Sequence, residues 1–276
     1  MIKANYHTHL VYCKHAEGHA EDYIEEAIKN NFVEIGITDH APILECFMSD
    51  YDYNENWCFQ SMKLDIMYSG YLKEVNLAKE KYKGQIKVLT GFETEYIEGN
   101  KFFVKKLKSL VDYLNLGVHF FDYDSTVYNS YSQVDYKSIY GYLNACIKGM
   151  ESNLFNTLVH PDLFMFKYQN INGQRVFDEH CEYVSRKIIE SAIKNNVYLE
   201  INANGIKNSL KYGVDKDWLY PCYDFWKIAK EYPDLKIIIG ADAHTPGALT
   251  CSYVEDVIKF AEELGLKIHE TMQINK

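Results

Sequence analysis

The sequence predicts an α/β fold: a distorted barrel of seven β/α units with its active site at the C-terminal ends of the strands. Seven short apolar runs rich in Val, Ile, Leu or Tyr recur along the chain, with longer helical patterns between them. Such runs are typical of buried parallel strands, and alternating strands and helices predict a parallel sheet. The expected strands cover residues 2–6, 34–38, 86–90, 114–118, 157–159, 197–201 and 236–240.

Amphipathic spacing predicts the helices. Within residues 179–195, apolar side chains such as Cys181 and Val184 recur three or four positions apart on one face. Residues 254–264 repeat this spacing, and Gly265 follows them as a residue type that commonly ends a helix. Similar patterns predict further helices over residues 21–30, 61–83, 101–110, 136–150 and 222–231.

The chain shows no boundary between domains. It contains no internal repeat, low-complexity tract or Pro/Gly-rich linker, so we expect residues 1–276 to form a single domain. Seven strand–helix units in one uninterrupted chain favour a closed or nearly closed TIM-like barrel. An open, doubly wound sheet is the structural alternative.

Composition restricts the class of protein. A hydrophobic content of 47% and a charged content of 25% are ordinary for a globular enzyme. We find neither a membrane-spanning apolar run nor a signal peptide, which predicts a cytoplasmic protein. The formal charge of -10 argues against a broad nucleic-acid surface, yet divalent cations in a cleft would still attract a small phosphate. The scattered cysteines form no C-x-x-C pair, which argues against a zinc ribbon or a disulfide framework.

The first candidate metal ligands follow the first expected strand. His7 and His9 are separated by one residue, and His15 comes shortly after them. Side chains alternate along a strand, so an H-x-H pair at a strand end presents both imidazoles on one side. Two imidazoles on one side can chelate a metal ion. Cys13 lies between these candidates and is the one cysteine that we expect near the site.

Metal-binding residue types follow six of the seven expected strands. In a β/α barrel these strand ends converge on one rim, where active sites are built. Nine donors are too many for one tetrahedral ion, so two or three divalent metals fit the count. We expect His19, His180 and His269 to be structural or solvated. The nine candidate ligands are His7, His9, His15, His40, Glu93, His119, His160, Asp242 and His244.

The order H-x-H, His, D-H, Glu, His, H-P and D-x-H resembles the polymerase-and-histidinol-phosphatase (PHP) superfamily of metallohydrolases. The match extends from His7 to His244. Further segments resemble its histidinol-phosphate phosphatase branch. These are TDHAP at 38–42, GFETEYIEG at 91–99, GVHFF at 117–121 and LEIN at 199–202.

The resemblance implies a trinuclear site that uses zinc, manganese or iron, with Asp242, His40 and Glu93 as the catalytic set. Glu93 would bridge the first and third metals. The resemblance assigns His7, His9, Glu93 and Asp242 to the first metal, His15, His40 and His244 to the second, and His119 and His160 to the third.

The branch implies hydrolysis of L-histidinol phosphate to L-histidinol and phosphate, a reaction of histidine biosynthesis. A water bridging two cations would lose a proton near neutral pH and attack phosphorus as hydroxide, and Asp242 could shuttle the proton. One alternative is a PHP phosphoesterase for another small phosphate, such as a nucleotide or sugar phosphate. A non-catalytic metal-binding module is the alternative from another class. The sequence specifies neither the oligomeric state nor the native metal.

Substrate contacts are predicted from position. Lys167 and Lys207 could bind phosphate, although the branch tends to use arginine and this chain is poor in it. Asn202 is a further expected contact, and Glu95 could meet an imidazole or amine of the substrate. The long loop 42–60 carries several aromatic residues and is predicted to be a lid or specificity element.

Overall fold

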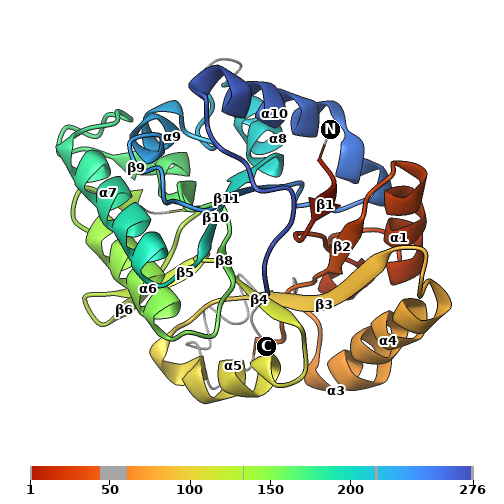
Figure 1. The fold of residues 1–276 in the computed structure, drawn as a ribbon. Helices are drawn as coiled ribbons and strands as arrows, with labels where there is room; N and C mark the ends of the chain where they lie inside the picture. Colours follow the sequence, from red (N-terminus) through yellow and green to blue (C-terminus); the bar gives the residue numbers. More distant parts are fainter. Residues whose placement is uncertain (1, 44–60, 133, 215–216, 275–276) are drawn as a thin grey trace.

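The computed structural model describes residues 2–43, 61–132, 134–214 and 217–274. Seven parallel strands form one sheet whose spatial order follows the sequence, and each expected strand is confirmed (Figure 1). A doubly wound sheet reverses its strand order at a switch point, so this alternative is wrong. The strands are β1 (Ala4–Asn5), β2 (Glu34–Ile37), β3 (Lys87–Thr94), β4 (Tyr113–Leu116), β8 (Thr157–Leu158), β10 (Tyr198–Asn202) and β11 (Ile237–Gly240).

The barrel is nearly closed at the rim that follows the carboxyl ends of the strands. The His9 amide donates to the Ala243 carbonyl at 2.8 Å, and the Ala243 amide donates to the His7 carbonyl at 3.1 Å. These two bonds join the segment after β11 to the segment after β1. They therefore bring the first and last groups of candidate ligands together, although β1 itself pairs only with β2.

The C-terminal tail covers the other end of the barrel. Ile268 forms a parallel bridge with Ile237 at the start of β11. Further along, the Met272 amide donates to the Tyr6 hydroxyl at 2.7 Å, and Met272 is buried. Figure 1 shows this segment crossing the barrel between β1 and β11. The tail therefore covers the gap between the short strand β1 and β11.

Every expected helical region is confirmed, and residues 61–83 contain two helices around a π-helical turn at Met67–Tyr71. The structure adds a helix that the sequence patterns did not predict, α8 (Asn204–Lys211). Among the described residues, no helix is long and apolar enough to cross a membrane. The other helices are α1 (Ala20–Lys29), α3 (Leu64–Ile66), α4 (Leu72–Lys81), α5 (Lys101–Lys108), α6 (Ile139–Glu151), α7 (Glu179–Lys194), α9 (Tyr223–Ala229) and α10 (Ser252–Leu264).

Shorter elements decorate the barrel between β4 and β10. An antiparallel hairpin joins β5 (Phe120–Tyr123) to β6 (Thr126–Asn129), and β7 (Val134–Asp135) pairs with β9 (Tyr168–Gln169). None of these strands was predicted. Single 3₁₀ turns occupy Val11–Cys13, Glu98–Asn100, Leu163–Phe166 and Pro246–Thr250.

Helix ends follow local chemistry. The Asp178 carboxylate caps α7, because it accepts from the amides of His180 at 3.0 Å and Cys181 at 3.2 Å. Gly265 ends α10 with a φ of 66°, as the sequence predicts. The apolar face of α7, which includes Val184 and Ile188, is buried in the core. This packing fixes the strands whose ends carry the candidate ligands.

Candidate metal centre

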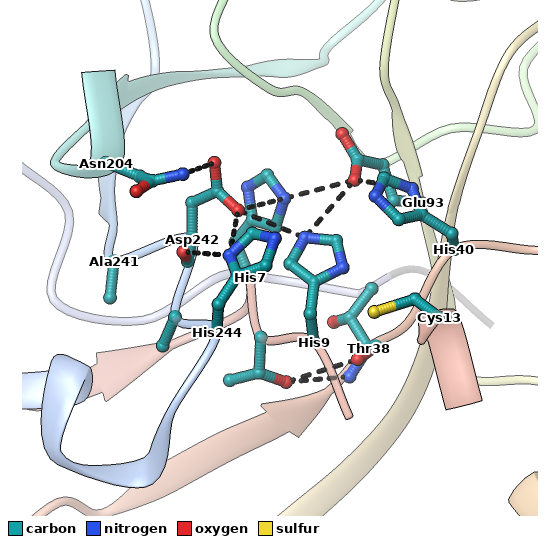
Figure 2. Close-up of polar contacts among 12 residues, drawn as sticks. His7, His9, Cys13, Thr38, His40, Glu93, Asn204, Ala241, Asp242 and His244 are labelled. Carbon is teal, nitrogen blue, oxygen red and sulfur yellow. Dashed lines mark hydrogen bonds and ion pairs between the residues drawn. The ribbon is translucent and has the colours of Figure 1, made fainter. Parts of the chain in front are cut away.

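All nine predicted ligands lie in segments at or just beyond the carboxyl ends of the strands, so the structure brings them to one rim. Figure 2 shows His7, His9, His40, Glu93, Asp242 and His244 turned toward one another. Glu93 is the second-last residue of β3, and the parallel bridge between His40 and Glu93 extends the pairing of β2 with β3. His7 and Glu93 are almost completely buried, whereas His15 is exposed. The cluster therefore reaches from the barrel interior to the surface.

The first predicted group converges on two carboxylate oxygens. The Nε2 atoms of His7 and His9 lie 3.3 and 3.4 Å from Glu93 Oε2. The same atoms lie 3.5 and 3.0 Å from Asp242 Oδ1. Two ligand atoms about 2.1 Å from one tetrahedral ion are roughly 3.4 Å apart. His7 Nε2 and Glu93 Oε2 are buried without a hydrogen-bond partner, so this donor set fits a metal ion.

The second oxygen of Glu93 faces another pair of imidazoles. Glu93 Oε1 lies 3.2 Å from His119 Nε2 and 2.9 Å from His160 Nε2. The two oxygens of one carboxylate thus serve two different groups of donors. This geometry fits a carboxylate that bridges two ions, as the sequence resemblance implies.

The remaining predicted group is more open. Ring centroids of His15 lie 5.3 Å from those of His40 and 5.0 Å from those of His244. His40 turns its Nδ1 atom toward Glu93 Oε2 at 3.2 Å. Within the described residues, donor atoms of His9, His40 and Glu93 gather closely, but the trio of His15, His40 and His244 does not form a comparably tight group.

Glu200 orients His7 from behind. Its carboxylate contacts His7 Nδ1 at 2.9 and 3.0 Å, which leaves Nε2 directed at Glu93 and Asp242. The carboxylate reaches this position because Gly240 has no side chain: a Cβ there would lie 2.0 Å from Glu200 Oε2. Sequence analysis assigned no role to Glu200, although its place at the carboxyl end of a strand was a usable signal.

Glu95 performs the same task for His119. Its Oε1 atom lies 2.7 Å from His119 Nδ1, so Nε2 points at Glu93. Gly117 permits the close approach of His119 to Glu93, since a Cβ at position 117 would lie 2.5 Å from Glu93 Oε1. The buried Glu95 carboxylate is therefore engaged by a candidate ligand, and its predicted contact with substrate stays a prediction.

Backbone carbonyls and a second carboxylate orient other imidazoles. His15 Nδ1 faces the Cys13 carbonyl at 2.9 Å, and His244 Nδ1 faces the Asp242 carbonyl at 3.0 Å. Behind His9, Asp39 Oδ1 lies 3.7 Å from Nδ1, and Cys13 is buried beside them. Such contacts fix the ring orientation and leave the opposite nitrogen available for a ligand bond.

The electrostatics favour bound cations. Burial disfavours the charged forms of Glu93 and Asp242, but neighbouring imidazoles overcome it and hold both carboxyl pKa values well below their usual range. Burial lowers the pKa of His40 well below its ordinary value and the pKa of His244 to about 3. These two rings are therefore neutral, which is the form that binds metal. Ionised carboxylates beside the neutral rings of His40 and His244 suit zinc, manganese or iron.

Comparison with known proteins identifies the family. The model of the PHP domain matches residues 5–204. The chain belongs to the PHP domain family. The histidinol-phosphatase of Bacillus subtilis is 24% identical over 92% of this chain and 97% of its own length.

Solved structures of similar proteins show that the PHP barrel is shared. A histidinol phosphate phosphatase from Lactococcus lactis, determined with zinc, L-histidinol and phosphate, has a TM-score of 0.70 at 18% identity, and the match covers 99% of both chains. A candidate histidinol phosphatase from Listeria monocytogenes has a TM-score of 0.73 at 21% identity over 92% of this chain and 99% of its own. At these identities the likeness concerns the fold.

A cavity of about 400 Å³ opens over the PHP ligand cluster. Its lining consists of eight of the nine candidate ligands and of side chains that are not ligands. The predicted contact Lys207 is one of them. Sequence analysis did not identify the others, which are Tyr131, Asn204, Asn208 and Lys211.

The other two predicted substrate contacts, Asn202 and Lys167, are not among the residues that line the cavity. Asn202 is fully buried. Its amide donates to Glu200 at 2.8 Å and to Asp242 at 3.3 Å, so it holds two carboxylates of the candidate metal centre in place. The Lys167 amino group lies 5.3 and 5.0 Å from the ring centroids of Phe166 and Tyr212. The predicted lid lies, from residue 44 onward, outside the described residues.

Proposed function

We propose that this PHP protein is a metal-dependent phosphomonoesterase that hydrolyses L-histidinol phosphate to L-histidinol and phosphate. The observation that carries the proposal is the convergence of imidazoles on the two oxygens of Glu93 beneath a cavity that bears lysines. The near full-length match to the Bacillus subtilis histidinol-phosphatase supports the choice of substrate. The reaction belongs to histidine biosynthesis, and we expect the enzyme to act in the cytoplasm.

Two or three divalent ions would be held here, with three as the proposed number. His7, His9, Glu93 and Asp242 form the best-supported set, because their donor atoms have the separations of atoms that share one ion. Bound divalent ions supply Lewis acidity, which lowers the pKa of water and offsets negative charge on the phosphoryl group. The trio of His15, His40 and His244 and the pair of His119 and His160 would complete the centre.

Glu93 and Asp242 have distinct tasks in this proposal. Glu93 spaces the two groups of donors, since each of its oxygens faces a different group. Asp242 directs Oδ1 at the imidazoles, while Oδ2 accepts from the amides of Asn204 at 3.1 Å and Asn202 at 3.3 Å (Figure 2). Amide donors favour the ionised form of a carboxylate. Asp242 can therefore accept a proton from the attacking water.

The test is release of inorganic phosphate from L-histidinol phosphate by protein reconstituted with manganese or zinc. Sugar phosphates and nucleotides serve as competing substrates. We expect histidinol phosphate to give the highest kcat/KM and His7→Ala to lower it on the order of 10²- to 10³-fold. His180→Ala is the matched control, because His180 lies on α7 and outside the cluster.

Each outcome distinguishes one of the possible functions from the others. A higher kcat/KM for a sugar phosphate or nucleotide would retain the phosphoesterase and overturn the histidinol assignment. Bound metal without turnover on any phosphomonoester would instead indicate a metal-binding module. Equal activity of His7→Ala and the unaltered protein would overturn the metal mechanism itself.

A further inference from the structure

Helix α8 forms one wall of the cavity over the metal centre. Four of its side chains line the cavity: two amides four residues apart and two amines four residues apart. Among the described residues that line this cavity, Lys207 and Lys211 are the only lysines or arginines. They lie one helical turn apart and therefore on the same face. The face consists of Asn204, Lys207, Asn208 and Lys211.

Lys207 and Lys211 are both exposed, and no ion pair within the described residues explains why two lysines line this cavity. Neither forms an ion pair with a carboxylate of the described residues, whereas Lys194 and Lys187 on α7 do. Like charges four residues apart destabilise a helix. The arrangement also occurs in a chain with a net charge of -10. Two uncompensated ammonium groups on a cavity wall therefore indicate an anionic ligand.

Hydrogen bonds hold helix α8 in a defined position next to the ligand cluster. The Asn202 side chain accepts from the Gly205 amide at 2.9 Å while its own amide donates to Asp242. Asn204 donates to the same Asp242 oxygen at 3.1 Å. In the middle of the helix, Asn208 donates to the Tyr220 hydroxyl at 2.6 Å. The backbone that carries both lysines is thus fixed relative to the metal ligands.

We propose that Lys207 and Lys211 form a two-lysine clamp on the phosphate group, with Lys211 as the contact that sequence analysis did not identify. The clamp binds the phosphate oxygens directed away from the metal ligands. Two ammonium groups opposite a metal centre match the dianion of a phosphate monoester better than the monoanion of a diester. This inference rests on the proposed function, because it assigns the phosphate end of that substrate.

The test is calorimetric titration of inorganic phosphate into metal-loaded protein, which needs no turnover. Lys207→Met and Lys211→Met remove the charge and keep an unbranched apolar stem that suits a helix. We expect each variant to raise the Kd for phosphate roughly tenfold, with unchanged metal content, because charge-assisted contacts are strong. Lys211→Arg should retain most of the affinity. Lys83→Met on the far surface alters the net charge equally and should bind phosphate as the unaltered protein does.

Activity assays with the same variants separate the two proposals. In the clamp model, Lys211→Met raises KM for a phosphomonoester more than it lowers kcat, whichever alcohol the substrate carries. A loss of phosphate affinity in Lys211→Met would support the clamp even if histidinol phosphate proved to be a poor substrate. Unchanged Kd values in both single variants and in the double variant, with metal content intact, would overturn it.

Discussion

Two layers of buried polar groups lie next to each other in the barrel, and the hydroxyl groups of the lower layer have partners that two central donor atoms of the upper layer lack. In the lower layer, the Tyr6 hydroxyl donates to Glu34 at 2.5 Å, and the Tyr113 hydroxyl donates to the Tyr6 carbonyl at 2.9 Å. Thr38 also donates to this carbonyl, at 2.9 Å. In the upper layer, His7 Nε2 and Glu93 Oε2 lie against other donor atoms without forming a hydrogen bond.

The presence or absence of hydrogen-bond partners distinguishes polar groups that stabilise the fold from polar groups that serve the metal centre. A buried polar group costs little when it is hydrogen-bonded and is expensive when it is not. The paired hydroxyls of the lower layer are therefore explained by folding alone, whereas a cation between them would explain the unpaired His7 Nε2 and Glu93 Oε2 of the upper layer. Mutations in the two layers should then have opposite signatures. In the upper layer they should lower metal content and activity, and in the lower layer they should lower thermal stability.

Glu93→Gln tests the upper layer with the largest expected effect. The amide keeps the size of the side chain but removes the charge shared by two groups of imidazoles. We expect kcat to fall on the order of 10³-fold and the bound metal per chain to decrease. Phosphate release and metal analysis by mass spectrometry would measure both quantities.

Glu200→Gln should have an intermediate effect. The carboxylate accepts the proton of His7 Nδ1, whereas the amide of glutamine can donate to this nitrogen and place the proton on Nε2 instead. That tautomer cannot bind a metal through Nε2. We expect a loss of metal affinity of about 10- to 100-fold. Competition with a chromogenic chelator would measure it.

Glu34→Gln is the matched control for this exchange. Glu34 is also a buried carboxylate at a strand, but it belongs to the lower layer, where it contacts Tyr6 and Lys87. This variant should unfold at a lower temperature and retain its affinity for metal. If Glu34→Gln lost metal as strongly as Glu200→Gln does, the two layers would not be separable.

The grouping of the candidate ligands in the upper layer could be predicted from the sequence, because metal-binding residue types follow the ends of the expected strands. His40 and His160 could be placed near His7 without knowing any contact, since parallel strands bring their carboxyl ends together. The strands themselves were predictable from their apolar runs. The orienting carboxylates were not, because pairing of Glu200 with His7 spans 193 residues and depends on the side-chain directions at both strand ends.

Helix α8 was not predictable for a physical reason. It has a single large buried side chain, Ile206, and its other buried residues, Gly205 and Ser209, are small and give no apolar period. The helix is instead held by polar contacts such as that between Asn208 and Tyr220. Position along the chain was an equally poor guide for Lys167, whose amino group lies over aromatic rings.

Tyr113→Phe tests the lower layer with the smallest expected effect. Removal of the hydroxyl ends its bonds to Thr38 and to the Tyr6 carbonyl. This carbonyl keeps two donors, Thr38 and the Asn115 amide at 2.8 Å, so no acceptor is left unpaired. We expect a loss of about 1 kcal/mol in the free energy of unfolding and a thermal midpoint roughly 2–4 °C lower by calorimetry. The metal content and kcat should stay within about twofold of the unaltered values, since the lost hydroxyl contacts Thr38 and Tyr6 and no candidate ligand. A fall in kcat at an unchanged midpoint would show that the lower layer positions the metal centre as well as the fold.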